Sequence, residues 1–118
     1  MTSDRTNNID KLTLLYNEKN YADLVKTAKD ILDQDGSSAT IWNFLALGYK
    51  NIGETQKAVA LYENLLKSNP ANFILNTNAG NLFLNIGRLN DSVKCLEAAL
   101  SSKPNHVATL LSFGLALI

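Results

Sequence analysis

The stretch IWNFLALGYKNIGETQKAVALYENLLKSNP, which runs from Ile41 to Pro70, decides the fold of this chain. It contains two amphipathic runs that are separated once, at Gly53, and it ends in a proline. Apolar side chains recur at helical spacing in both runs, and a glycine supplies the left-handed conformation that stops a helix. The stretch therefore predicts two antiparallel helices joined by a tight turn.

The same order of large and small residues returns 34 residues further along the chain. The matching pairs are Ala46 and Gly80, Tyr49 and Phe83, Gly53 and Gly87, and Pro70 and Pro104. A fixed period of this size indicates a stacked helix–turn–helix repeat. We expect an all-α fold that forms a single array over residues 1–118. The expected repeats are residues 5–38, 39–72 and 73–106, followed by a first helix at 107–118.

The skeleton of the second repeat resembles a known family. Trp42, Leu45, Ala46 and Tyr49, followed by Ala58, Tyr62 and Pro70, are similar to the tetratricopeptide repeat pattern W-x2-L-G-x2-Y, A-x3-F and P. The resemblance implies a right-handed α-solenoid of about three and a half repeats. Residues 78–81 and 85–89 also resemble the arrays that precede O-linked N-acetylglucosamine transferases. Similar arrays precede bacterial sulfotransferase, glycosyltransferase and methyltransferase domains.

The periodicity also predicts local features of the helices. We expect residues 1–7 to be frayed, with a first helix from Asn8 that Asn7 or Asn8 caps, and a second helix from Tyr21 to Asp33. Lys19 and Asn20 stand at the first turn, where asparagine is the cheapest substitute for glycine. Trp42 is expected to be a large buried ring, and Ser37 or Ser38 to cap its helix. Glu63 and Lys67 are spaced to form an ion pair. In the third repeat, Asn76, Ala79, Ser92 and Leu96 replace the family's residues, which predicts looser packing.

The composition limits the classes of function. The chain has 118 residues, a formal charge of zero and a single cysteine, and it lacks an apolar leader or a run of about 18 apolar residues. These features argue against nucleic-acid and membrane partners and are compatible with a cytoplasmic location. His106 is expected to be a turn or capping residue and Cys95 a small packing residue, so we predict neither an enzyme nor a cofactor or metal site.

Asparagine is unusually frequent on the first helices of the repeats. In the family, first helices line the concave surface on which partner peptides lie, and an amide offers both donors and an acceptor to a peptide backbone. The alternative is that these asparagines only form a polar, solvent-exposed face and bind no ligand. The candidate peptide-binding residues are Thr13, Tyr16, Asn17, Asn43, Leu47, Lys50, Asn51, Thr77, Asn78, Asn81, Leu84 and Asn85.

The last expected helix carries no charged residue after His106. Its apolar surface includes Leu110, Phe113 and Leu117, and an apolar patch of this kind marks an interface or a fragment of a longer chain. We expect a fragment, and self-association through these residues is the alternative.

The expected function is that of a non-catalytic scaffold that binds a protein or peptide on its concave face. The alternative is an arm of a larger transferase that recruits substrates or forms a dimer.

Overall fold

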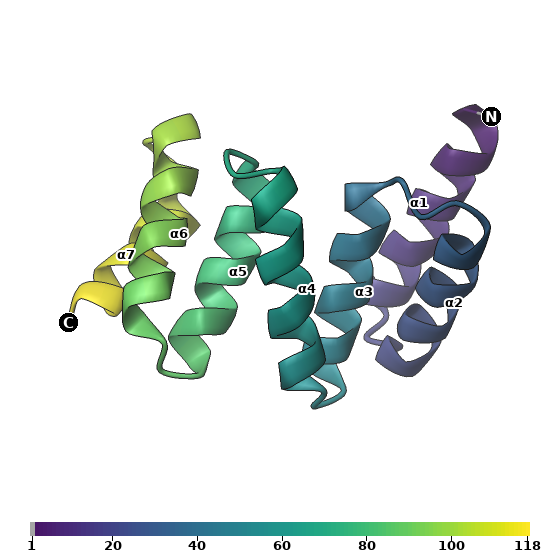
Figure 1. Cartoon of the computed structure of the whole chain (residues 1–118), viewed down its shortest axis with the longest axis horizontal. Helices are drawn as coiled ribbons and strands as arrows, with labels where there is room; N and C mark the ends of the chain where they lie inside the picture. Colours follow the sequence, from purple (N-terminus) through teal and green to yellow (C-terminus); the bar gives the residue numbers. More distant parts are fainter. Residues whose placement is uncertain (1) are drawn as a thin grey trace. The chain divides into compact units, whose positions relative to one another are not determined.

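The computed structural model describes residues 2–118, with side chains from residue 6 onward, and every regular element in this part of the chain is an α-helix (Figure 1). The all-α class predicted from the sequence is confirmed. The helices follow one another through short turns. In chain order they are α1 (Thr2–Asn17), α2 (Tyr21–Gln34), α3 (Ala39–Asn51), α4 (Thr55–Ser68), α5 (Phe73–Asn85), α6 (Leu89–Ser102) and α7 (Val107–Leu117).

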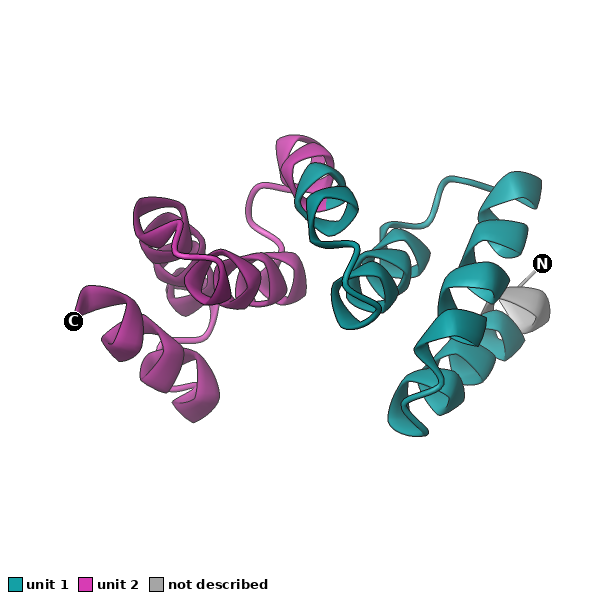
Figure 2. Cartoon of the chain, turned by 90° about the horizontal axis from the view of Figure 1, so that it is seen from below, with its two compact units in different colours: residues 1–61 teal, residues 62–118 magenta. Residues whose placement is uncertain are grey.

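The chain divides into two compact units, and the division falls inside α4 (Figure 2). Unit 1 comprises residues 1–61, and unit 2 comprises residues 62–118. In unit 1, α1 contacts α2 and α3, and α2 contacts α3. Burial of large apolar side chains between these helices supplies the main stabilising term. The core of unit 1 consists of Leu12, Leu24, Val25, Ala28, Ile41 and Leu45.

Unit 2 is built on close contact between α5 and α6. A Cβ atom at Gly80 would lie 2.7 Å from two atoms of Leu96, so only glycine lets the two helices approach this far. The Ser92 hydroxyl is buried and donates a hydrogen bond to the Gly80 carbonyl at 2.7 Å. Ala79, Ser92 and Leu96 are all fully buried. The three substituted residues therefore lie in the interior of unit 2, and the looser packing of the third repeat stays a prediction.

Three turns between helices share one backbone plan. Gly53 and Gly87 have φ values of 86° and 82°, and Lys19 holds the equivalent place with φ of 58°. In each turn the next residue donates its N–H to a carbonyl five residues earlier, as in a Schellman motif. These bonds run from Asn20 to Leu15, from Glu54 to Tyr49 and from Arg88 to Phe83, at 2.9, 2.8 and 2.9 Å. The left-handed residue of the first turn is therefore Lys19 and not the asparagine that follows it.

The first helices of the later repeats begin at equivalent caps. Side-chain acceptors on Ser38, Asn72 and His106 receive the N–H groups of Ile41, Leu75 and Thr109. Each satisfies a donor that the first turn of a helix leaves unpaired. The predicted capping roles of Ser38 and His106 are confirmed.

Three local expectations are corrected by the structure. The first helix begins at Thr2, so the asparagines at positions 7 and 8 lie inside α1 and do not cap it. Glu63 pairs with Arg88 at 3.3 Å instead of with Lys67, because the turn at Gly87 brings the guanidinium to it. Trp42 is only partly buried, because its indole N–H reaches outward to the Gly36 carbonyl at 2.8 Å.

Candidate functional site

The first helices of unit 1, α1 and α3, contact one another and carry seven of the predicted binding residues. Asn17 and Asn51 are exposed, and Tyr16, Leu47 and Lys50 are partly buried. The Tyr16 ring packs edge-on against the Tyr21 ring, with 6.0 Å between the ring centroids. This contact holds the Tyr16 ring in one orientation on the surface of α1.

Three of these seven residues are less available to a ligand. The Asn43 side chain is only 7% exposed, so it lies in the interior of the helix layer. The Asn51 amide donates one N–H to the Leu47 carbonyl of its own helix at 2.8 Å, which leaves its second N–H and its side-chain oxygen for a ligand. The exposed Thr13 hydroxyl likewise donates to the Ile9 carbonyl at 2.7 Å.

The predicted binding residues of unit 2 all lie on α5. Thr77, Asn78, Asn81 and Leu84 are partly buried, and Asn85 is exposed. The Thr77 hydroxyl oxygen is buried and has no hydrogen-bond partner among the described residues. A buried hydroxyl without a partner is costly, and a ligand that reaches it would offset that cost.

Sequence reasoning missed the contribution of α7 to this surface. α5 contacts α7, and the 34-residue period places Leu111 and Leu115 at the positions of Thr77 and Asn81. Both leucines are strongly exposed, at 66% and 61% of their surface. The period itself was the signal that could have found them. Within unit 2, the polar face of α5 therefore has an apolar continuation on α7.

A second face of α7 carries the residues predicted for self-association. Leu110 and Leu117 are 43% and 60% exposed, and Phe113 is partly buried. Gly114 stands one period after Gly80, but a Cβ atom there would meet nothing within 4 Å. At Gly80, α6 packs closely against α5. At the equivalent Gly114, no described residue packs against α7.

The described residues contain no group of histidine, cysteine or acidic side chains that could hold a metal ion. Nor is any helix in the described part long and apolar enough to span a bilayer.

The helix pairs, their closing turns and their equivalent caps define a protein built from helical-hairpin repeats. Residues 53–112 match the family model described as tetratricopeptide repeat, which covers just over half of the chain. This chain belongs to the tetratricopeptide repeat family, whose fold serves protein–protein interaction.

Two curated relatives share part of this sequence. The chain is 32% identical over 91 residues to the trafficking protein particle complex subunit 12 of Mus musculus, and 31% identical to that of Homo sapiens. Each match covers 75% of this chain but only 11% of the mouse protein and 12% of the human one. The chain thus spans about a tenth of the length of these relatives.

Solved structures share the fold at low sequence identity. The first TPR domain of human RPAP3 superposes with a TM-score of 0.83 at 14% identity, covering 92% of this chain and 86% of that domain. MamA of Desulfovibrio magneticus has a TM-score of 0.81 at 18% identity, covering 94% of this chain and 63% of that one. These similarities agree with the all-α repeat fold.

Proposed function

We propose that this chain binds segments of partner proteins on the face formed by the first helices of its repeats. The observation that carries the proposal lies in unit 2, where exposed leucines of α7 continue the polar face of α5. Asn81 and Asn85 offer donors and acceptors to a peptide backbone, and Leu111 and Leu115 offer an apolar surface to its side chains. A segment that presents both kinds of group fits this surface.

The test is a screen of an array of peptides of mixed composition with the purified chain. Peptides that bind are then measured in solution by fluorescence anisotropy. Leu111→Ser and Leu115→Ser remove apolar contact on the proposed face, and Asn81→Ala removes an amide. We expect each change to weaken binding about tenfold or less, since contacts of this kind contribute about 1–2 kcal/mol each.

Leu89→Ser is the matched control, because Leu89 is an exposed apolar residue of α6, which is not one of the first helices that form the proposed face. It should leave the affinity unchanged. Equal affinity in wild type and in all three variants of the proposed face would show that the bound peptides use another surface.

A second candidate function rests on the open face of α7. We propose that this face, with Leu110, Phe113, Gly114 and Leu117, pairs with the same face of a second copy. Gly114 carries no side chain and has open space where the equivalent Gly80 holds a helix, so another helix could approach closely there. A helix that pairs with its own copy gives a self-complementary interface with two-fold symmetry.

Light scattering tests this second proposal. A dimer that Leu117→Asp or Leu110→Asp converts to monomer is the expected result, because a charge placed in an apolar interface is strongly unfavourable. Leu14→Asp, at an exposed position of α1, is the control that should leave the dimer intact. A wild-type chain that stays monomeric at high concentration would refute the proposal.

A further inference from the structure

A groove of about 470 Å³ lies in unit 2, on a surface other than the face of the first helices. Its walls come from the last turns of α4 and from α6, with contributions from α5. The volume falls within the usual range for binding pockets, about 300–1,000 Å³. The groove is open to solvent rather than enclosed.

Asparagine lines this groove at the position where the preceding repeat has tryptophan. Asn76 is one period after Trp42, and its amide nitrogen donates to the Pro70 and Asn72 carbonyls, both at 2.9 Å. These two bonds hold the small side chain against the backbone, and its volume is much smaller than that of an indole. Leu66, Phe83 and Cys95 are apolar residues in the lining of the groove, and the last two are largely buried.

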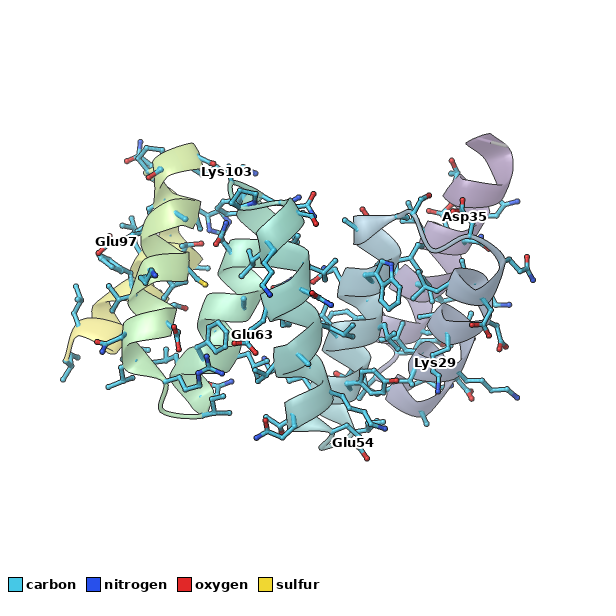
Figure 3. The ribbon with its side chains drawn as sticks, viewed as in Figure 1. Lys29, Asp35, Glu54, Glu63, Glu97 and Lys103 are labelled. Atoms are coloured by element: carbon cyan, nitrogen blue, oxygen red, sulfur yellow. The ribbon has the colours of Figure 1, made fainter. Side chains whose placement is uncertain are left out.

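An ion cluster closes one end of the groove. Arg88 donates to Asp91 at 2.9 Å and to Glu63 at 3.3 Å, and its guanidinium lies 4.6 Å from the centroid of the Phe83 ring. Figure 3 labels Glu63 on α4, from which it reaches this guanidinium. The hydrogen bonds to Asp91 and then to Glu63 raise the pKa of Arg88. Both carboxylates of the groove are therefore engaged by one cation.

Besides Arg88, two more cationic side chains line the groove. Lys67 from α4 and Lys94 from α6 line it, and neither forms an ion pair with any described residue. The groove therefore combines apolar walls with two lysines whose charge the chain itself does not neutralise. A ligand that carries a carboxylate beside an apolar group complements both features.

We propose that this groove binds a segment of a partner protein that inserts an aromatic side chain and places an acidic residue beside it, against Lys67 and Lys94. The aromatic group follows from the comparison with Trp42, since one period earlier the chain supplies an indole itself. A protein segment fits an open groove better than a small molecule does, because small ligands have most of their surface buried in their sites.

The probe is the fluorescein-labelled peptide Gly-Ser-Asp-Trp-Glu-Gly-Ser, measured by fluorescence anisotropy with the intact chain. We expect saturable binding at or below about 1 mM. Two matched peptides, with alanine for the tryptophan or with lysines for the acidic residues, should bind much more weakly. Amide chemical shifts in an NMR titration should change around Leu66, Cys95 and Ala98, which line the groove.

Two sets of variants locate the site. Asn76→Trp copies the preceding repeat and should fill the groove, which would lower the affinity by at least about tenfold. Lys67→Ala and Lys94→Ala should each weaken binding by up to about fivefold, the equivalent of an exposed ion pair of about 1 kcal/mol. Both lysines are exposed, so these two variants test the proposal even if Asn76→Trp disturbs the fold.

Lys29→Ala on α2 is the control for general charge and should bind like wild type, as should Leu111→Ser. Equal binding by wild type and by the Lys67 and Lys94 variants would overturn the proposal. So would the absence of binding to the acidic peptide, or shift changes confined to α5 and α7 residues of the first-helix face. A failure here leaves the proposed function intact, because no substitution is expected to weaken binding at both sites.

Discussion

In the turns that lead into α3 and α5, one backbone carbonyl accepts a hydrogen bond from a side chain of the following helix, but the side chain differs between the two turns. Before α3, the indole N–H of Trp42 donates to the Gly36 carbonyl at 2.8 Å; before α5, the amide of Asn76 donates to the Pro70 carbonyl at 2.9 Å. Donor and acceptor are both displaced by the same 34 residues. The repeat therefore keeps the hydrogen bond while the volume of the side chain varies, and the smaller side chain lines a groove.

The largest effect is expected from Trp42→Ala. It removes a large ring that packs against the core of unit 1 and leaves the Gly36 carbonyl without its donor. We expect a loss of about 3 kcal/mol in the free energy of unfolding, at the low end for tryptophan because the ring is only partly buried. Urea unfolding followed by circular dichroism measures it. A loss below about 1 kcal/mol would mean that the ring contributes little to the fold.

Asn76→Ala should have a smaller effect, because it removes hydrogen bonds but little apolar surface. The loss of both amide bonds from a buried side chain should cost about 1–2 kcal/mol. Asn76→Trp, which restores an N–H donor, should be more stable than Asn76→Ala in the same unfolding experiment. The reverse order would mean that unit 2 does not tolerate the side chain that unit 1 uses.

Lys19→Gly tests whether the first turn needs the same left-handed residue as the turns at Gly53 and Gly87. A lysine at φ of 58° is strained, whereas glycine adopts this conformation freely. We expect the substitution to stabilise the chain by about 1 kcal/mol, seen as a higher Tm. Gly53→Lys is the mirror experiment and should lower Tm by a similar amount. Equal stability of all three chains would show that the turns do not require the left-handed conformation.

The smallest effect concerns Cys95, whose position corresponds to Leu61 in the preceding repeat. Burial raises the pKa of the Cys95 thiol, and the nearby Asp91 carboxylate acts in the same direction. Folding therefore favours the protonated thiol. This stabilisation is complete below the thiol pKa of the unfolded chain, about 8.5, and is lost as the pH rises through the folded pKa.

The measurement is the rate of reaction with a disulfide reagent. At pH 8 the folded chain should react more slowly than the same chain in urea. In parallel, the difference in unfolding free energy between wild type and Cys95→Ala should shift in favour of the variant above about pH 9. A folded chain that reacts as fast as the unfolded one would contradict the predicted protection.

Much of the fold could be predicted because the period repeats local physics. Helix-stopping residues at Gly53 and Gly87, and the cap at Ser38, act through bonds to their own neighbours, so the sequence alone reveals them. The left-handed conformation of Lys19 was harder to predict, because the geometry of the turn imposes it and lysine itself does not favour it. The helical start at Thr2 was missed because polar residues there show no apolar period.

The candidate site was less predictable, because exposure depends on which helix lies next to a residue. Asn43 and Asn85 are both asparagines on first helices, yet one is buried and the other exposed. Leu111 and Leu115 were assigned no role, because only the side of the last helix that carries Leu110, Phe113 and Leu117 was considered. The pairing of Glu63 with Arg88 spans 25 residues, and spacing within one helix could not reveal it.

The closing turns have a consequence for how such a chain can change in length. Each Schellman turn and each cap is completed by groups only a few residues away, so every hairpin carries its own start and stop. Adding a second copy of residues 39–72 directly after Asn72 would leave all of these bonds available, while an insertion of any other length would put the wrong residues at the joints. Growth by whole periods is therefore the easiest route by which this chain could lengthen.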